Sequence, residues 1–390
     1  MTKLKNPFFI VPVLLSFFVM SFLDLVGIGV DRVSSDLNID ASLAQLIPSA
    51  AFLWFLLLSV PVGVLQAKYG KKRLLNIGML VTAVGLLVPF FFYSFAMVLM
   101  GFALLGIGNT IIQVSANPLL IDVVSSNRAS SSMSFSQFIK AIGSMLGPPL
   151  AALFAAKFGD WKILFLVYGL VSILAVAWLG SVKITESVSK EERASFLSSF
   201  RLLKTRFIAL MVLSIFVVVG IDVGFNSNSG QFLMNSYGMG QVEAESGRSI
   251  YFFGKMLGTL TGAIILTRFS SRKMYLWSAV LGILAIVLLL AFKTPMAAWV
   301  ITFVIGLAIA NIFPLVFAIT VQKFPDHMNA ISGLMMMAIC GGAVIPPLIG
   351  WVTFISNNVF GMAVLLLCLL FLLAVSIYAL KQEKINKHDA

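Results

Sequence analysis

The sequence predicts an all-α membrane protein with twelve transmembrane helices, and three observations carry this prediction. Of the 390 residues, 60% are hydrophobic and 11% are charged, whereas soluble proteins carry about 25% charged residues. The mean hydropathy is +1.03. Apolar runs of roughly 20 residues, the length that a helix needs to cross a bilayer, follow one another along the chain.

Composition excludes several other classes of protein. A disordered chain combines low hydrophobicity with high net charge, and the strands of a membrane β-barrel are about 10 residues long with alternating polarity. The formal net charge is +12, but the basic residues lie between apolar runs and form no patch with interleaved aromatics, so no nucleic acid partner is expected. Two cysteines and two histidines, scattered along the chain, predict no metal, no cofactor and no enzyme.

In the first half of the chain, short charged segments separate the apolar runs. The residues from Lys68 to Arg73 divide the second run from the third, and Lys157 and Lys162 divide the fifth from the sixth. The predicted helices there are 7–30, 43–67, 74–94, 96–122, 132–156 and 161–182.

The second half repeats this arrangement after a hydrophilic stretch, KITESVSKEERASFLSSFRLLKTR. Its predicted helices are 207–235, 249–269, 274–293, 296–320, 330–354 and 359–380. The predicted domains are therefore an N-terminal six-helix half (1–182), a linker (183–206), a C-terminal six-helix half (207–380) and a tail (381–390).

The distribution of Lys and Arg predicts the orientation. With both termini and the even-numbered loops inside, 20 basic residues fall on the inside and five on the outside. Because inner loops are enriched in Lys and Arg, both termini, the linker and the tail are predicted to be cytoplasmic. We expect a multi-pass protein of the plasma membrane, the inner membrane of a bacterium. The five outside residues are Arg32, Lys157, Lys162, Arg248 and Lys293.

An internal repeat relates the two halves at an offset of about 198 residues. GSMLGPPL at 143–150 matches GGAVIPPL at 341–348, and Asp24 lies 198 residues before Asp222. Two parallel six-helix repeats are an arrangement of transporters, which place the substrate site at mid-membrane between them. Shared packing alone explains paired glycines and prolines, but it explains paired carboxylates poorly, because a charge at the centre of a membrane helix costs about 2.5–3.5 kcal/mol or more.

Four charged residues are predicted to lie well inside the spans: Asp24, Lys140, Asp222 and Lys255. Each should face a water-filled cavity or a partner. Polar residues with helical spacing share a face with them. These stripes are Asn109, Gln113 and Asn117 on the fourth helix, Gln137, Lys140 and Ser144 on the fifth, Asp222, Asn226 and Ser229 on the seventh, and Tyr251, Lys255 and Thr259 on the eighth.

Amides and acids beside aromatic rings suit a polyhydroxylated ligand, whose hydroxyls bond the polar groups while the rings cover its C–H faces. Two structural interpretations compete with this one. The amides can serve as interhelical hydrogen bonds, and the four charges can form a structural Asp–Lys network.

Several segments resemble a known family. GVLQAKYGKKR at 63–73 is similar to the loop motif Gly-x-x-x-Asp-Arg-x-Gly-Arg-Arg of the major facilitator superfamily, with Ala67 at the position of the acid. Five further segments resemble the fucose–proton symporter family of that superfamily. The resemblance implies the superfamily's fold of two pseudo-symmetric six-helix halves. The segments are QVSANPLL at 113–120, VGIDVGFNS at 219–227, SIYFFGKMLGTLTG at 249–262, NIFPLVFAI at 311–319 and CGGAVIPPLIGWV at 340–352.

The resemblance implies uptake of a monosaccharide such as L-fucose, galactose or glucose, coupled to proton entry. By position, Gln113 falls where the family has a sugar-facing glutamate, Lys140 where it has an asparagine, and Thr259 where it has an arginine. Asp222 occupies the position of the seventh-helix acid, whereas Asp24 lies about one turn before the expected first-helix position.

We therefore expect a secondary active transporter, and not an enzyme, that takes up a monosaccharide by proton symport with alternating access. Two alternatives remain open: a carrier of acidic sugars or other organic anions, which the two lysines would suit, and a non-transporting membrane sugar sensor. The expected partners are the sugar, H⁺ and membrane lipid, and the expected state is a monomer. The expected proton-coupling residues are Asp24 and Asp222, and the expected substrate-binding residues are Asn109, Gln113, Asn117, Gln137, Lys140, Asn226, Tyr251, Lys255, Thr259 and Asn311.

Overall fold

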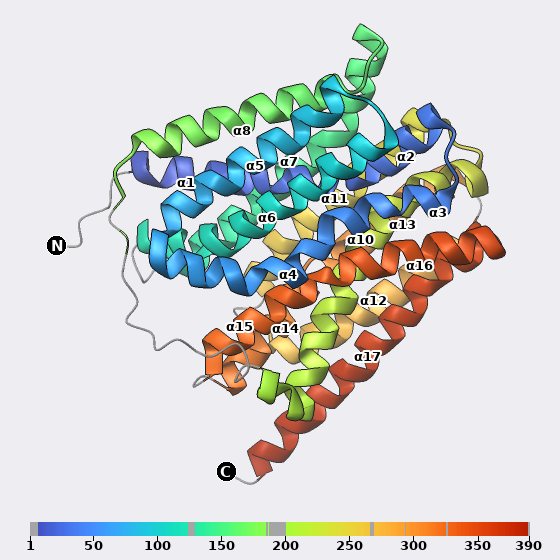
Figure 1. Cartoon of the computed structure of the whole chain (residues 1–390). Coiled ribbons are helices and arrows are strands. Elements are labelled where there is room, and N and C mark those ends of the chain that lie inside the picture. The colour runs from blue at the N-terminus through green and yellow to red at the C-terminus, as the bar shows by residue number, and fades with distance from the viewer. Residues whose placement is uncertain are drawn as a thin grey trace. The chain divides into compact units, whose positions relative to one another are not determined.

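The computed structural model describes residues 7–123, 129–184, 186, 200–265, 269–292, 294–324 and 327–388, and the secondary structure within these ranges is entirely helical (Figure 1). The chain forms two compact units, residues 1–192 and 193–390. The predicted all-α architecture is confirmed. His388 is the last described residue, and Lys293 of the positive-inside count lies outside the described ranges.

The first unit contains the helices predicted for the first half, with one interruption. The first span changes from α-helix to a 3₁₀ segment and back, and a short helix, α3, precedes the second span. The elements are α1 (Pro7–Met20), η1 (Ser21–Leu25), α2 (Val26–Leu37), α3 (Ala41–Ala44), α4 (Leu46–Tyr69), α5 (Lys71–Phe91), α6 (Phe95–Val123), α7 (Ala129–Phe158) and α8 (Ile163–Ser181).

The second unit begins with a short 3₁₀ turn and a long unbroken helix, α10. Two of its spans, formed by α13 and α14 and by α15 and α16, are interrupted. The elements are η3 (Leu202–Lys204), α10 (Arg206–Tyr237), α11 (Gln241–Ile265), α12 (Ser271–Ala291), α13 (Pro295–Ile309), α14 (Ile312–Lys323), α15 (Met328–Met337), η5 (Ala338–Cys340), α16 (Gly341–Ile355) and α17 (Asn358–His388).

Eleven spans within the described residues are long and apolar enough to cross a membrane. The exception among the twelve predicted helices is α11. At 25 residues it is long enough, but it carries Glu243, Glu245, Arg248 and Lys255. A charged side chain within a membrane span has to face the protein interior or a partner, and Glu245 and Arg248 are both buried, each 1% exposed.

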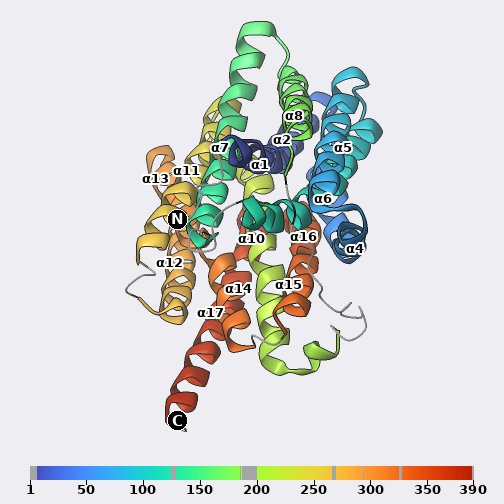
Figure 2. The same cartoon turned by 90° about the vertical axis from the view of Figure 1, so that its left-hand side faces the viewer.

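Glycines let the helix backbones of each unit approach closely. In the first unit α5 and α6 lie side by side (Figures 1 and 2), and a Cβ added to Gly106 of α6 would lie 1.9 Å from the carbonyl oxygen of Ala51 on α4. In the second unit a Cβ on Gly306 of α13 would lie 2.1 Å from the carbonyl oxygen of Tyr251 on α11. Small residues at helix contacts are the usual means by which membrane helices pack.

Two of the basic residues predicted to lie in outside loops are buried within helices, which corrects the sequence analysis. Arg32 belongs to α2 and Arg248 to α11, and they are 9% and 1% exposed. Asp31 and Glu245, 3% and 1% exposed, are buried beside them in sequence. The prediction failed because α2 continues to Leu37, past its predicted end at 30, and α11 begins at Gln241, before its predicted start at 249.

One end of the first unit is held by Asp36, which accepts hydrogen bonds from the Tyr93 hydroxyl (2.7 Å) and from Nε1 of Trp161 (2.8 Å). We call these three residues the Asp36 clamp, because they join α2, the α5–α6 turn and the residues before α8. Burial, reinforced by the hydrogen bond to Asp36 and its negative charge, raises the pKa of Tyr93. The hydroxyl therefore remains a donor at neutral pH.

Candidate functional site

In the second unit the structure brings together three predicted site residues, Asp222, Tyr251 and Lys255. Asp222 lies near the middle of α10, and the other two lie one turn apart on α11. Nζ of Lys255 is 2.8 Å from Oδ1 and 2.7 Å from Oδ2 of Asp222, and the Tyr251 hydroxyl donates to Oδ1 at 2.5 Å. We call this set the Asp222 triad. An ammonium and a hydroxyl thus share one carboxylate inside the membrane span.

Aromatic rings surround the Asp222 triad. The Tyr251 ring is fully buried and packs on Phe225, with centroids 4.9 Å apart. The Lys255 ammonium lies 5.7 Å from the centroid of Tyr251 and 5.5 Å from that of Phe252, distances at which a cation is attracted to the ring face. The ion pair keeps some access, since 22% of the Lys255 and 29% of the Asp222 side chain are exposed. The charged groups are therefore accessible, while the tyrosine ring is not.

Asn226 lies one turn after Asp222 on α10 and is 3% exposed. Its backbone carbonyl oxygen accepts a hydrogen bond of 2.6 Å from Nε of Arg248. The buried arginine therefore joins α11 to α10 next to the Asp222 triad. Glu245, one turn earlier on α11, accepts a hydrogen bond of 3.4 Å from Nε2 of Gln241.

In the first unit Asp24 lies in the 3₁₀ segment η1, near the middle of its span. Its Oδ2 accepts a short hydrogen bond from the hydroxyl of Ser144 on α7. Ser144 also donates to the carbonyl oxygen of Lys140 at 3.1 Å. The two repeat-related aspartates are thus both engaged in their own units, but with different kinds of partner.

The predicted amide stripe on α6 exists as a chain of hydrogen bonds. Asn109 is fully buried and donates to the carbonyl oxygen of Met20 at 2.7 Å. Nε2 of Gln113 donates to Oδ1 of Asn109, and Nδ2 of Asn117 donates to the carbonyl oxygen of Gln113, both at 3.2 Å. Asn109 therefore joins α6 to the first span, whereas Gln113 and Asn117 are only partly buried.

The other predicted site residues have individual surroundings. Lys140 is partly buried and makes no ion pair within the described residues, while Gln137, three residues earlier on α7, is exposed. Thr259 donates to carbonyl oxygens of its own helix. Asn311 is 6% exposed and donates to the carbonyl oxygen of Gly258 at 2.7 Å, so it joins α14 to α11.

Four buried charged residues of these spans were not predicted as part of the site. A sequence signal existed for Glu245 and Arg248, which are three positions apart and so share a face of the helix, but not for the adjacent Asp31 and Arg32. Within the described residues no group of three or more His, Cys, Asp and Glu is arranged to hold a metal ion. The four residues are Asp31, Arg32, Glu245 and Arg248.

Three known proteins are similar to this chain. The glucose/galactose transporter of Brucella abortus biovar 1 is 24% identical over 348 residues, which is 85% of this chain and 84% of that protein. The crystal structure of the Escherichia coli fucose:proton symporter FucP matches with a TM-score of 0.70 and 16% identity, covering 97% of this chain and 99% of FucP. The nucleoside transporter NupG matches with a TM-score of 0.73 and 15% identity over the same shares.

These similarities extend over most of the chain, and the two structures share its fold. The family model of the Major Facilitator Superfamily matches residues 12–247 and 212–389, which together include nearly every described helix. This result agrees with the sequence prediction of a multi-pass membrane protein that is a transporter and not an enzyme. The chain belongs to the Major Facilitator Superfamily.

Proposed function

We propose that this protein is a secondary active transporter that takes up a monosaccharide together with a proton by alternating access. The observation that carries the proposal is the pair of repeat-related aspartates, each near the middle of a membrane span and each hydrogen-bonded within its own unit. A carboxylate at this depth is expensive to keep without a function. The glucose/galactose transporter among the relatives supports a sugar as the substrate.

Asp24 and Asp222 are the groups proposed to bind the proton. Protonation would remove the negative charge that now accepts the Ser144 hydroxyl in one unit and the Lys255 ammonium in the other. Each aspartate can therefore couple a change of charge to a change of its helix contacts. The proposed orientation has both termini in the cytoplasm of a bacterium, so the proton would enter with the sugar.

Three amides are proposed to bind sugar hydroxyls: Gln113 and Asn117 on α6, and Asn226, one turn after Asp222 on α10. Removing one of these amides would leave a sugar hydroxyl without its partner, which costs roughly 1–3 kcal/mol, or about a 5- to 150-fold loss of affinity. Alanine variants that fold should show this loss in a sugar-binding titration. Unchanged affinity in all three variants would assign them to helix packing.

The charge balance favours a neutral sugar over an acidic one. Lys255 is compensated by Asp222 within the protein, so it needs no substrate carboxylate. Lys140 has no ion pair within the described residues. In the alternative of an acidic sugar, the carboxylate of the substrate would pair with it. Competition of neutral sugars and glucuronate for a bound ligand distinguishes the neutral from the acidic substrate. Strong competition by glucuronate alone would establish the acidic substrate if it is lost in Lys140→Gln. The control variant Lys157→Gln, on the same helix, should keep it.

Uptake into proteoliposomes tests the proposal. A panel of neutral, amino and acidic sugars is offered with and without an inwardly directed proton gradient, and we expect one neutral monosaccharide to accumulate only with the gradient. Asp24→Asn or Asp222→Asn should abolish accumulation but leave counterflow exchange. Asp40→Asn, in an exposed loop of the first unit, is the control for loss of one negative charge. If both membrane variants accumulate sugar normally, neither aspartate carries the proton, and if no sugar accumulates, the substrate class is wrong.

A further inference from the structure

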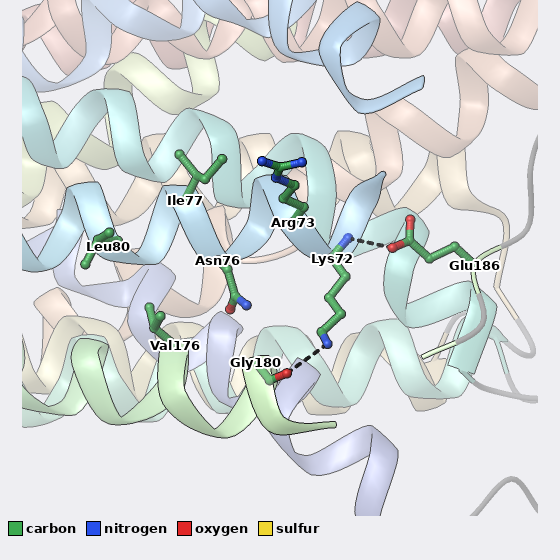
Figure 3. A pocket seen from close by; sticks show the side chains of 8 residues that line it. All are labelled: Lys72, Arg73, Asn76, Ile77, Leu80, Val176, Gly180 and Glu186. Carbon is green, nitrogen blue, oxygen red and sulfur yellow. Dashed lines mark hydrogen bonds between the residues drawn. The ribbon is translucent and has the colours of Figure 1, made fainter. Parts of the chain in front are cut away.

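A groove of about 390 Å³ lies on the first unit between α5 and α8, and none of its lining residues is a predicted substrate residue (Figure 3). Its α5 wall extends from Lys72 to Leu80, and its α8 wall from Val176 to Gly180. The helices are held together beside it by Ser172, whose hydroxyl donates to the carbonyl oxygen of Met79 at 2.7 Å.

One end of the groove is polar and carries positive charge. Glu186 accepts hydrogen bonds from the backbone N–H groups of Lys71 (2.5 Å) and Lys72 (3.2 Å), so its carboxylate is occupied in capping α5. Nζ of Lys72 donates to the carbonyl oxygens of Gly180 and Val182 (Figure 3 draws the first) and has a third N–H.

Arg73 supplies the second cation of this end. Its side chain is exposed and makes no ion pair within the described residues; the guanidinium carbon lies 5.8 Å from the ring centroid of Tyr69. Among the described residues, Arg73 is thus a charge that no carboxylate compensates. Next to it Asn76 has a buried Oδ1 with no hydrogen-bond partner among the described residues, which suits a hydroxyl donor.

The other end of the groove is apolar and open. Ile77 and Leu80 are 41% and 49% exposed, and Val176 lines the opposite wall. Leu80 lies seven residues beyond Arg73, about 10 Å deeper along the helix axis. Because α5 is a membrane span from Lys71 to Phe91, the cations lie at the interface and the apolar end lies in the hydrocarbon region.

We propose that this groove binds one anionic phospholipid. The phosphate would lie against Arg73 and the third N–H of Lys72, a head-group hydroxyl would donate to Asn76, and an acyl chain would follow Ile77, Leu80 and Val176. A soluble anion would use only the polar end, and a zwitterionic lipid would bring its own cation to Arg73. The combination of a cation at the interface with an open apolar groove below it therefore favours an anionic lipid.

Native mass spectrometry of the delipidated full-length protein tests this proposal, with phosphatidylglycerol and phosphatidylcholine as the probes. We expect tighter binding of phosphatidylglycerol and a roughly five-fold weakening in Arg73→Gln, the effect of one cation near an anionic surface. Gly180→Leu should weaken binding similarly by filling the groove. A Cβ at Gly180 meets only Nδ2 of Asn76, at 3.7 Å, so the backbone has room for it. Arg73→Lys should retain binding.

The matched control is Lys273→Gln, because Lys273 is the exposed third residue of α12 as Arg73 is of α5. Equal loss in this control would mean general surface electrostatics and would overturn the proposal. So would unchanged binding in Arg73→Gln and Gly180→Leu. Displacement of the lipid by glycerol 3-phosphate at the same concentration would assign the groove to a soluble anion instead.

Discussion

The two units carry an aspartate at the same repeat position, yet they hold it in different ways. Asp24 lies in a 3₁₀ segment and accepts from a serine on the fifth span, whereas Asp222 lies in a continuous α-helix and accepts from a tyrosine and a lysine on the eighth. Shifted by 198 residues, Ser144 corresponds to Gly342, and Tyr251 and Lys255 correspond to Leu53 and Leu57. Both units therefore have a carboxylate at the repeat position, but the side chains that bond it differ between the units.

The same difference affects packing, and it gives the largest expected effect. Gly143 and Gly341 are repeat equivalents. A Cβ at Gly341 would lie 1.8 Å from the carbonyl oxygen of Phe216, whereas one at Gly143 would lie 2.0 Å from the hydroxyl of Ser21. Gly341→Ala should lower the free energy of unfolding by more than about 3 kcal/mol. Overpacking costs typically 1–3 kcal/mol, and here the clashing atom belongs to the backbone, which cannot rotate away as a side chain can.

Gly143→Ala should be milder, and Ser21→Ala should partly rescue it. Thermal unfolding of the purified variants measures both effects. Gly333→Ala, where a Cβ meets nothing within 4 Å, is the control. Gly341→Ala with the stability of this control would contradict the difference between the units.

The second prediction concerns the ion pair between Asp222 and Lys255. Removing one partner of a fully buried pair costs about 3–5 kcal/mol. Because Lys255 and Asp222 are 22% and 29% exposed, we expect about 1–3 kcal/mol for Lys255→Gln. The double variant Asp222→Asn/Lys255→Gln should regain stability, since it leaves no uncompensated charge. A double-mutant cycle by thermal unfolding measures the coupling, and simple additivity would show that the pair contributes nothing.

Third, the hydroxyl groups of the two units can be compared directly. Tyr251→Phe and Ser144→Ala each remove one hydrogen bond to a carboxylate, which is worth about 1.5–3 kcal/mol. Tyr251→Phe should have the smaller effect, because Lys255 still donates twice to Asp222. Denaturation and proton-driven uptake are the measurements. A larger loss in Tyr251→Phe would mean that the phenol, and not the ammonium, dominates at Asp222.

The Asp36 clamp gives the smallest expected effect and depends on pH. Its repeat equivalents in the second unit are Met234, Ala291 and Val359, so it belongs to the first unit alone. Because the pKa of Tyr93 is raised in the folded protein, the stability that its hydroxyl contributes is complete below the unfolded pKa of about 10 and is lost as the pH rises above it.

Tyr93→Phe should therefore lose about 1 kcal/mol at pH 7 and differ less from the wild type at pH 11. Unfolding followed at both values tests this. If the difference in free energy of unfolding between wild type and variant is the same at both pH values, titration of the Tyr93 phenol does not affect stability.

The sequence predicted most of the helices because the length of an apolar run indicates a span, but charged residues near the ends of α2 and α11 hid where these helices end and begin. Lysines paired with membrane aspartates were expected, and Lys255 with Asp222 is such a pair. Interhelical hydrogen bonds of the amides were one of the two interpretations, but the sequence did not predict their acceptors, nor that Asp24 would bind Ser144. Helical spacing identifies the face of a side chain, but its partner depends on the distance between helices, which small residues far along the chain control.

The 3₁₀ segment η1 has a geometric consequence for the whole first span. A 3₁₀ turn advances about 120° per residue and an α-helix about 100°, so five residues add a rotation of about 100° and a lengthening of about 2.5 Å. This extra rotation equals the rotation that one additional α-helical residue would add. A helical wheel drawn straight through the span therefore assigns everything after Leu25 to the wrong face. Asp31 and Arg32, buried in α2, lie in the part of the span that this rotation turns.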